Sequence, residues 1–321
     1  MTAPRLTTFG ESLLRLATPT AEPIETTDAF DVHVGGAEGN VAVAAQRLGL
    51  EATWVSKLPA TPVGEKVTTA YRTHGVDPAV VWDESDDARL GTYYLEAGAA
   101  PRGSQVIYDR AGSSITTATF EELPTAPFTE VDAVHVSGIT PALSETLVET
   151  TKEVLSTANA NGATTVFDVN YRSNLWDPES ARDTLTDLLP DVDVLFVAHR
   201  DAETVLEYDG DAETVAADLL ADYDHELVVV TTGEAGALAF DGETSAHQPV
   251  FETETVDAIG TGDAFVGGFL AAWLTDETIP AALEQAAATA ALKRTIGGDA
   301  ATIRPEMVES ILEGDVDAIS R

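Results

Sequence analysis

The sequence contains no cysteine, and this absence excludes both a disulfide framework and a thiolate site. It also has no apolar run long enough to span a bilayer, since the longest, residues 264–274, contains eleven residues. The first residues lack the charged-then-apolar order of a signal peptide. Together these absences predict a cytoplasmic protein without a membrane partner.

Basic residues are scarce. The chain has 17 lysines and arginines against 55 aspartates and glutamates, a formal net charge of −38, and only four of its residues are lysines. The acidic residues are spread along the whole chain, which argues against nucleic acid and anionic membranes as partners. This composition is typical of a protein that works in concentrated salt, where the Debye length is about 3 Å at 1 M and self-repulsion is screened.

The 321 residues fit one large α/β domain that carries an insertion. Residues 12–34 show no helical period, so we expect irregular or edge-strand structure there. Elsewhere short apolar runs alternate with helical patterns. The predicted strands are residues 6–9, 52–57, 133–137, 164–169, 192–197, 227–232, 237–240 and 249–256, and the predicted helices are residues 40–48, 141–160, 264–274 and 280–295.

A glycine turn before the most apolar helix carries the clearest chemical signal. Gly260, Thr261 and Gly262 precede this run, and Asp263 follows them. Glycines let a ligand approach the backbone, and the free N–H groups of a first helical turn favour an anion such as phosphate. A carboxylate beside a bound phosphate suggests a general base that takes a proton from an attacking hydroxyl. The alternative is that Asp263 only caps the helix.

A second glycine stretch lies near the start of the chain. Gly35 and Gly36 precede a helix with Asn40 near its beginning, which indicates either a ligand against the backbone or an ordinary tight turn. The stretch departs from the G-x-G-x-x-G dinucleotide motif. The chain also has no G-x-x-x-x-G-K-[ST] motif, so a classical P-loop is excluded.

Residues 88–111 alternate with a period of two, which predicts a β-hairpin inserted into the α/β pattern. We expect Tyr94, Tyr108 and Arg110 to share one face of this hairpin. The face either covers a site or packs in a routine way against the body of the protein.

Polar residues follow two predicted strands. Asp168, Asn170 and Arg172 stand at the end of residues 164–169, where open α/β sheets bind ligands. Thr232 and Gly233 end residues 227–232 and suit a phosphate contact. A salt bridge to a surface acid is the alternative for Arg172. No histidines fall at metal-ligand spacing, so no metal held by the protein alone is predicted.

The GGAEGN stretch at residues 35–40, the DAIGTGDAF stretch at 257–265 and the distance between them resemble the ribokinase-like (PfkB) sugar kinases over nearly the whole chain. The resemblance implies one domain, residues 1–321. Its fold would be a three-layer α/β/α sandwich with a mainly parallel sheet and a small β-sheet lid formed by about residues 12–34 and 89–111. It also implies phosphorylation of a hydroxymethyl group with ATP and Mg²⁺, and a homo-oligomer paired through the lid.

Within this family, residues 93–114 and 168–176 resemble 2-keto-3-deoxygluconate kinases. The implied reaction phosphorylates the C6 hydroxyl of 2-keto-3-deoxygluconate, or of its galactonate epimer, in an Entner–Doudoroff-type pathway. By the same resemblance Asp263 is the catalytic base, and Gly260, Thr261 and Gly262 form an anion hole. The implied substrate site comprises Gly35, Gly36, Asn40, Tyr94, Tyr108, Arg110, Asn170, Arg172, Asp263 and Asp299. The implied nucleotide contacts are Thr232, Gly233, Gly260, Gly262 and Asp201.

The sequence departs from the family at residues 198–201, where Ala-His-Arg-Asp replaces the usual Asn-x-x-Glu. The shorter carboxylate of Asp201 bears on how Mg²⁺ is held. Two alternatives stay open: a kinase for fructose, a phosphorylated fructose or a nucleoside, and a catalytically inactive sugar-binding protein of the same fold. Two arginines, Arg110 and Arg172, in the expected pocket of so acidic a chain favour an anionic substrate, because the arginine fork fits a carboxylate.

Overall fold

The computed structural model describes residues 3–19, 22–98 and 101–314. Its centre is a nine-stranded sheet with the order β13-β12-β11-β10-β9-β8-β1-β4-β5. The strands from β11 to β5 in this order pair in parallel, whereas β12 is antiparallel to both of its neighbours, β11 and β13. Their bounds are Arg5–Phe9 (β1), Glu51–Pro59 (β4), Asp77–Asp83 (β5), Ala133–Ser137 (β8), Thr164–Asp168 (β9), Val194–Ala198 (β10), Leu227–Thr231 (β11), Ala237–Phe240 (β12) and Ser245–Gln248 (β13).

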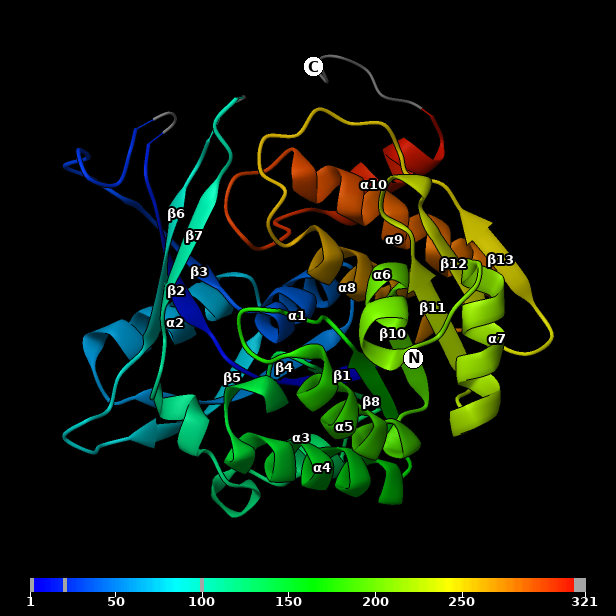
Figure 1. The fold of residues 1–321 in the computed structure, drawn as a ribbon, viewed down its shortest axis with the longest axis horizontal. Coiled ribbons are helices and arrows are strands. Elements are labelled where there is room, and N and C mark those ends of the chain that lie inside the picture. The colour runs from blue at the N-terminus through cyan, green and yellow to red at the C-terminus, as the bar shows by residue number, and fades with distance from the viewer. Residues whose placement is uncertain (1–2, 20–21, 99–100, 315–321) are drawn as a thin grey trace.

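Helices cover both faces of this sheet (Figure 1), and the apolar strands between them are buried on both sides, as parallel strands require. One buried cluster contains Phe128 and Phe167, and another contains Phe196 and Phe269. The predicted three-layer α/β/α sandwich is therefore confirmed. The helices are Ala37–Arg47 (α1), Pro62–Thr73 (α2), Ala126–Thr129 (α3), Glu145–Ala160 (α4), Pro178–Leu188 (α5), His199–Asp201 (α6), Ala212–Tyr223 (α7), Thr261–Trp273 (α8), Ile279–Arg294 (α9) and Pro305–Leu312 (α10).

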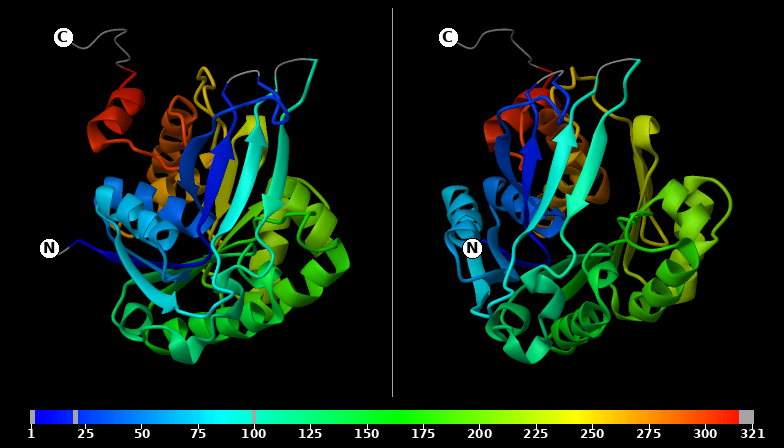
Figure 2. Two further views of the ribbon diagram at one scale, coloured as in Figure 1. Left: turned by 90° about the vertical axis from the view of Figure 1, so that its left-hand side faces the viewer. Right: turned by 60° about the vertical axis from the view of Figure 1, so that its left-hand side comes forward.

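A separate four-stranded sheet stands upright beside these layers (Figure 2). Its strand order is β3-β2-β6-β7. Residues 12–34 supply two of its strands, and the predicted hairpin supplies the other two. The bounds are Leu13–Ala17 (β2), Asp31–Gly35 (β3), Gly91–Glu96 (β6) and Gln105–Asp109 (β7).

The expected partnership of Tyr94 with Tyr108 is wrong. The register pairs Tyr93 with Tyr108 and Tyr94 with Ile107. Because neighbouring residues of a strand point to opposite faces, Tyr93 shares the face of Tyr108, and their rings lie 5.5 Å apart. Tyr94 instead packs against Phe30, with ring centroids 5.8 Å apart. The sequence pattern gave the alternation of the hairpin but not its register.

Residues 249–256 were expected to form a strand, and this expectation is also wrong. The last strand, β13, ends immediately before Pro249, which lacks the N–H group that a continuing ladder needs. The segment runs instead to the end of α9, where the N–H groups of Val256 and Asp257 donate to the carbonyl of Arg294. This connection brings the glycine turn beside the carboxyl end of α9.

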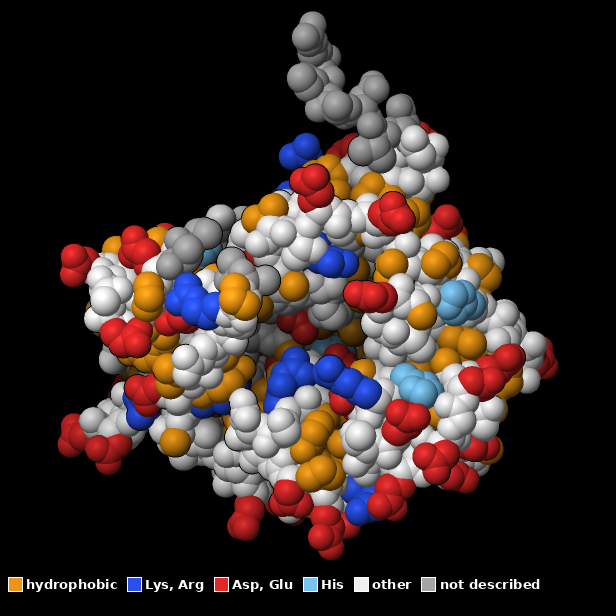
Figure 3. Space-filling view, turned by 45° about the horizontal axis from the view of Figure 1, so that its top comes forward, with side chains coloured by type: hydrophobic (Ala, Val, Ile, Leu, Met, Phe, Trp, Pro, Cys, Tyr) orange, Lys and Arg blue, Asp and Glu red, His pale blue; other side chains and the backbone are white. Residues whose placement is uncertain are grey.

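Acidic side chains are scattered over the surface, and a group of adjacent basic side chains lies at the edge of a central hollow, with other basic side chains standing singly (Figure 3). No helix among the described residues is both long and apolar enough to cross a membrane. The excess of acidic residues is therefore a property of the whole surface, whereas the basic group at the hollow is local.

We expect the melting temperature to rise steeply between dilute buffer and molar KCl. Unscreened repulsion among the surplus carboxylates loosens the compact state, and a shorter Debye length removes this repulsion. Thermal unfolding followed by circular dichroism at constant pH, in KCl and in NaCl, measures the effect. A melting temperature that does not change with either salt would contradict the link between acidic surface and habitat.

Candidate active site

A cleft of about 360 Å³ lies between the small sheet and the carboxyl ends of central strands. It opens where the strand order changes direction between β8 and β1, the usual ligand position in an open α/β sheet. Glu38 holds α1 against the end of β8 at this position, because its carboxylate accepts hydrogen bonds from the Ser137 and Thr140 hydroxyls at 2.8 and 2.7 Å. Burial raises the pKa of Glu38 to about 7. Gly10 makes room for this carboxyl, since a Cβ there would lie 2.2 Å from Glu38 Cδ.

The glycine turn forms one wall of the cleft. Gly260 precedes α8 with a φ of 80°, in the left-handed region that favours glycine. A Cβ at Gly260 would lie 2.0 Å from the carbonyl oxygen of Asp299, so a side chain is excluded for a second reason. Thr261 begins the helix, whose first-turn N–H groups and macrodipole suit an anion.

Asp263 lies in the first turn of α8 and faces the cleft. The interpretation that it only caps the helix is wrong, because Gly260 occupies the N-cap position. The Asn40 side chain donates to Asp263 Oδ2 at 2.7 Å and orients the carboxylate. Burial raises the pKa of Asp263 to about 6, against the lowering effects of Asn40 and Arg172. The group is therefore mostly ionised at neutral pH and able to accept a proton.

A second carboxylate, Asp168, lines the same cleft at the end of β9. Burial and then the nearby charge of Asp263 raise its pKa to about 7, while Arg172 lowers it. Two carboxylates with raised pKa values in one cleft are typical of a functional site.

The two predicted arginines differ in how they are held. Arg110 Nη1 donates to the buried Glu11 at 2.9 Å, and its guanidinium lies 4.6 Å from the centre of the Tyr108 ring. Arg172 Nη1 donates to the Tyr171 carbonyl oxygen at 3.0 Å. Among the described residues no carboxylate lies within ion-pair distance of Arg172. Within the described part of the chain Arg172 therefore forms no surface salt bridge, and its exposed side chain lines the cleft.

The small sheet contributes an aromatic wall. Tyr93 is buried and donates its hydroxyl to Asp299 Oδ2 at 2.9 Å, while Tyr108 is 41% exposed. Tyr93 therefore occupies the place in the cleft that was predicted for Tyr94. Gly35 does not line the cleft but packs against Asp299, which does. A Cβ at Gly35 would lie 2.5 Å from Asp299 Oδ2, so only glycine leaves room for that carboxylate.

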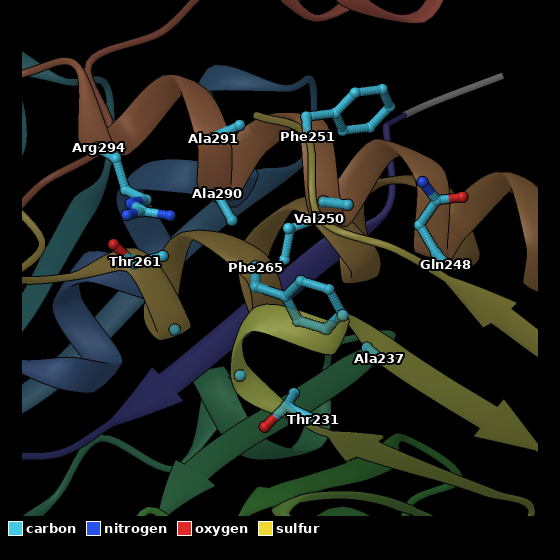
Figure 4. Close-up of a pocket in the computed structure, with 14 residues that line it drawn as sticks. Thr231, Ala237, Gln248, Val250, Phe251, Thr261, Phe265, Ala290, Ala291 and Arg294 are labelled. Carbon is cyan, nitrogen blue, oxygen red and sulfur yellow. The ribbon is translucent and has the colours of Figure 1, made fainter. Parts of the chain in front are cut away.

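A second pocket, of about 220 Å³, opens on the other side of the glycine turn (Figure 4). Val250 and Phe265 face into it, Thr261 and Arg294 lie at one end, and Gln248 lies at the other. Thr261 and Gly262 line both this pocket and the cleft. The glycine turn is therefore the wall that the two cavities share.

The residues predicted for the nucleotide are divided between this pocket and its surroundings. Gly233 and Gly262 line the pocket, and Gly260 lies in the cleft. Thr232 does not line this pocket but lines an adjoining cavity of about 540 Å³ together with Thr231 and Gly233, and its hydroxyl donates to the Gly236 carbonyl oxygen at 3.0 Å. Thr231 lines both cavities. Asp201 lies in a neighbouring basic cavity of about 490 Å³, lined also by Arg172 and Arg200.

Of the predicted substrate residues, the cleft brings together Gly36, Asn40, Tyr108, Arg110, Asn170, Arg172, Asp263 and Asp299. No sequence pattern marked Glu11, Glu38 and Tyr93, which line the cleft. The same holds for Arg15, which pairs with Asp299, and for Lys293, which donates to the Asp257 carbonyl oxygen. Arg15 and Glu11 belong to a segment with no helical period, so no pattern marked them. A buried charge within an apolar run, as in Leu-Leu-Arg-Leu at residues 13–16, is the signal that was available.

The site is that of a phosphoryl-transfer enzyme: two cavities meet at a glycine turn that ends in a carboxylate. The chain belongs to the pfkB family carbohydrate kinases, whose family model matches residues 3–306. It is an ATP-dependent carbohydrate kinase.

Three known proteins illustrate the similarity. A 2-dehydro-3-deoxygalactonokinase from Haloferax volcanii is 56% identical over 321 residues, which is 100% of each chain. The crystal structure of a 2-dehydro-3-deoxygluconokinase from Thermotoga maritima is 33% identical with a TM-score of 0.92, and the match covers 97% of this chain and 99% of that chain. A structure from E. coli in complex with ATP and Mg²⁺ shares the fold, with 20% identity and a TM-score of 0.88 over 97% of this chain and 99% of that chain.

Proposed function

We propose that this kinase transfers the γ-phosphoryl group of ATP to the C6 hydroxyl of a 2-dehydro-3-deoxy sugar acid, in a pathway of the Entner–Doudoroff type. One observation carries the proposal: the glycine turn with Asp263 separates the cleft from the nucleotide pocket, and Arg172 faces that cleft without an ion-pair partner among the described residues. The 56% identical relative acts on 2-dehydro-3-deoxygalactonate by its name, so we propose this epimer beside the gluconate epimer.

The geometry supports an in-line displacement. Asp263, oriented by Asn40, takes the proton of the C6 hydroxyl as the hydroxyl oxygen bonds to the γ-phosphorus and the bridging bond to ADP breaks. The first-turn N–H groups of α8 stabilise the charge on the transferred group. Arg172 holds the substrate carboxylate, and the wall of Tyr93 and Tyr108 excludes water. Pre-aligned groups of this kind act mainly by positioning.

The carboxylates fit the Mg²⁺ that accompanies ATP. Kinase sites usually hold Mg²⁺ through one or two carboxylates and the substrate phosphates. Asp168 is the last residue of β9, and Asp201 lies in α6, three residues after β10, with Arg200 Nε 3.2 Å from its carboxylate. Burial raises the pKa of each carboxyl. No group of three or more potential metal ligands occurs in the part of the chain that the structure describes. These two aspartates would hold the ion's water shell, and the ion would neutralise charge on the phosphates.

An ATP-consumption assay in molar KCl tests the proposal. The panel contains 2-dehydro-3-deoxygalactonate, 2-dehydro-3-deoxygluconate, fructose, fructose 6-phosphate, ribose and a nucleoside, and mass spectrometry locates the phosphate on the product. We expect the sugar acids to have the highest kcat/KM. A higher value for fructose or a nucleoside would contradict the proposed substrate, and no turnover with any compound would favour a sugar-binding protein.

We also propose that two copies pair through the small sheet. Its edge strand β7 is exposed, and Val106 and Ile107 on it are 40% and 45% exposed. An unpaired strand edge with apolar side chains is a template for pairing with another chain. Ile107→Lys should convert a dimer into a monomer in sedimentation experiments, while Val256→Lys, at a 71% exposed position elsewhere, should not. A wild-type monomer would contradict this pairing.

A further inference from the structure

A buried lysine lies directly behind the glycine turn. Lys293, in the last turn of α9, has no exposed surface at all. Its Nζ donates to the carbonyl oxygens of Asp257 and Ile296, at 3.3 and 3.1 Å. These carbonyls belong to two different segments, one that enters the glycine turn and one that follows α9. The ammonium group therefore ties the two segments together.

Charged side chains surround Lys293, and most of them are buried. Arg15, only 1% exposed, pairs with Asp257 at 2.8 Å and with Asp299 at 3.2 Å. The group thus contains two cations and two carboxylates. Asp257 also accepts from the N–H groups of Ile259 and Gly298 at 3.0 and 3.1 Å. Arg15 and Asp257, like Lys293, therefore join the two segments.

Further contacts connect Lys293 with the glycine turn and with the wall of the cleft. A Cβ at Gly260 would lie 3.4 Å from Lys293 Cε, so the lysine stem packs against the turn itself. Asp299, on the second segment, lines the cleft. A small shift of either segment would therefore move the first-turn N–H groups of α8 or the substrate wall. Misplacement of about 1 Å can cost about a hundredfold in rate.

We propose that Lys293 is a positioning residue whose ammonium acts as a built-in cation that holds residues 257–260 and 296–299 in the geometry needed for phosphoryl transfer. The inference rests on the kinase activity and not on which sugar acid is the substrate. Lys293 touches neither cavity, so it differs from the residues that bind ligands directly. A dissociable small cation placed between the same two carbonyls would do the same work.

The test removes the ammonium and then returns one. Lys293→Met should lower kcat about tenfold to a hundredfold with little change in the KM for ATP. Lys293→Ala should lose activity in NaCl and recover at least part of it in NH₄Cl at the same ionic strength. The wild type should respond equally to the two salts. Lys152→Met is the matched control, because Lys152 pairs with Asp187 on the surface and should be replaceable.

A second measurement does not use activity. Crystals of Lys293→Ala grown in RbCl should show an anomalous peak between the carbonyl oxygens of Asp257 and Ile296. The proposal would be overturned if the folded variants kept the wild-type kcat. It would also be overturned if ammonium did not restore the lost activity and the crystals showed no such peak. If neither variant folds in any of these salts while Lys152→Met folds, Lys293 is a requirement for folding and the positioning role is overturned as well. Failure of the proposed substrate would instead appear in the wild type.

Discussion

Asp263→Asn should lower kcat by about 10²–10⁴, the usual effect of removing a positioned general base. The amide keeps the size of the carboxylate but cannot take the proton of the attacking hydroxyl. Binding of ATP and of the sugar acid should persist, because the other groups of both cavities are unchanged. Initial rates and calorimetric titration of the same preparation separate turnover from binding. Near-normal turnover would show that Asp263 is not the base.

The control for this prediction is the other carboxylate of the cleft. Asp168→Asn makes the same chemical change at the end of β9. If Asp168 were the base, its variant and not Asp263→Asn would show the larger loss in kcat. The comparison is necessary because burial raises the pKa of both groups.

The pH dependence gives a separate signature of the same base. Because burial raises the pKa of Asp263 to about 6, the carboxyl is increasingly protonated, and inactive as a base, as the pH falls through that value. We expect kcat/KM to decrease in that range, and Asp263→Asn should lose this dependence on Asp263.

Arg172→Met should lower kcat/KM for the sugar acid by about 30-fold to several thousand-fold. Arg172 is exposed in the structure, so the expected loss applies to the pair that forms when bound substrate covers the guanidinium. Losing one partner of a charge pair desolvated in this way costs about 2–5 kcal/mol, and each 1.4 kcal/mol is about tenfold. The KM for ATP and the melting temperature should hold. Arg172→Lys should recover only part of the activity, because a point charge does not replace the planar fork. The measurement is steady-state kinetics with each substrate varied in turn.

The matched control is Arg304→Met, the same change at an arginine whose side chain is 68% exposed and which precedes α10. An exposed pair of this kind is worth about 0–1 kcal/mol, so kinetics and stability should be nearly unchanged. A loss in Arg172→Met that appears equally with ATP, or only as lost stability, would make Arg172 structural and would remove the main argument for an acidic substrate.

Local sequence was sufficient for the chemistry that short motifs carry. The turn at Gly260 has a backbone conformation that favours glycine, and an apolar helix follows it, so the turn and the place of Asp263 beside it were predictable from neighbouring residues. The parallel sheet was predictable for a similar reason, because its strands are short apolar runs. Arg172 was predictable from its place at the end of a strand.

Register and long-range pairing were not predictable in this way. The alternation of β6 and β7 fitted either tyrosine, and only the pairing of Tyr93 with Tyr108 decides which one enters the cleft. Local pattern has a period of two and contains no information on the partner strand.

The sequence alone determined the fold class, the acidic surface, the glycine turn and its carboxylate, because each depends on composition or on residues a few positions apart. The tertiary structure alone decided that Arg110 is bound to Glu11 whereas Arg172 is not, and that Arg15 and Lys293 meet Asp257 and Asp299 behind the turn. These charges are distant in the chain. Their burial is tolerable only once folding has brought opposite charges and carbonyl groups around them.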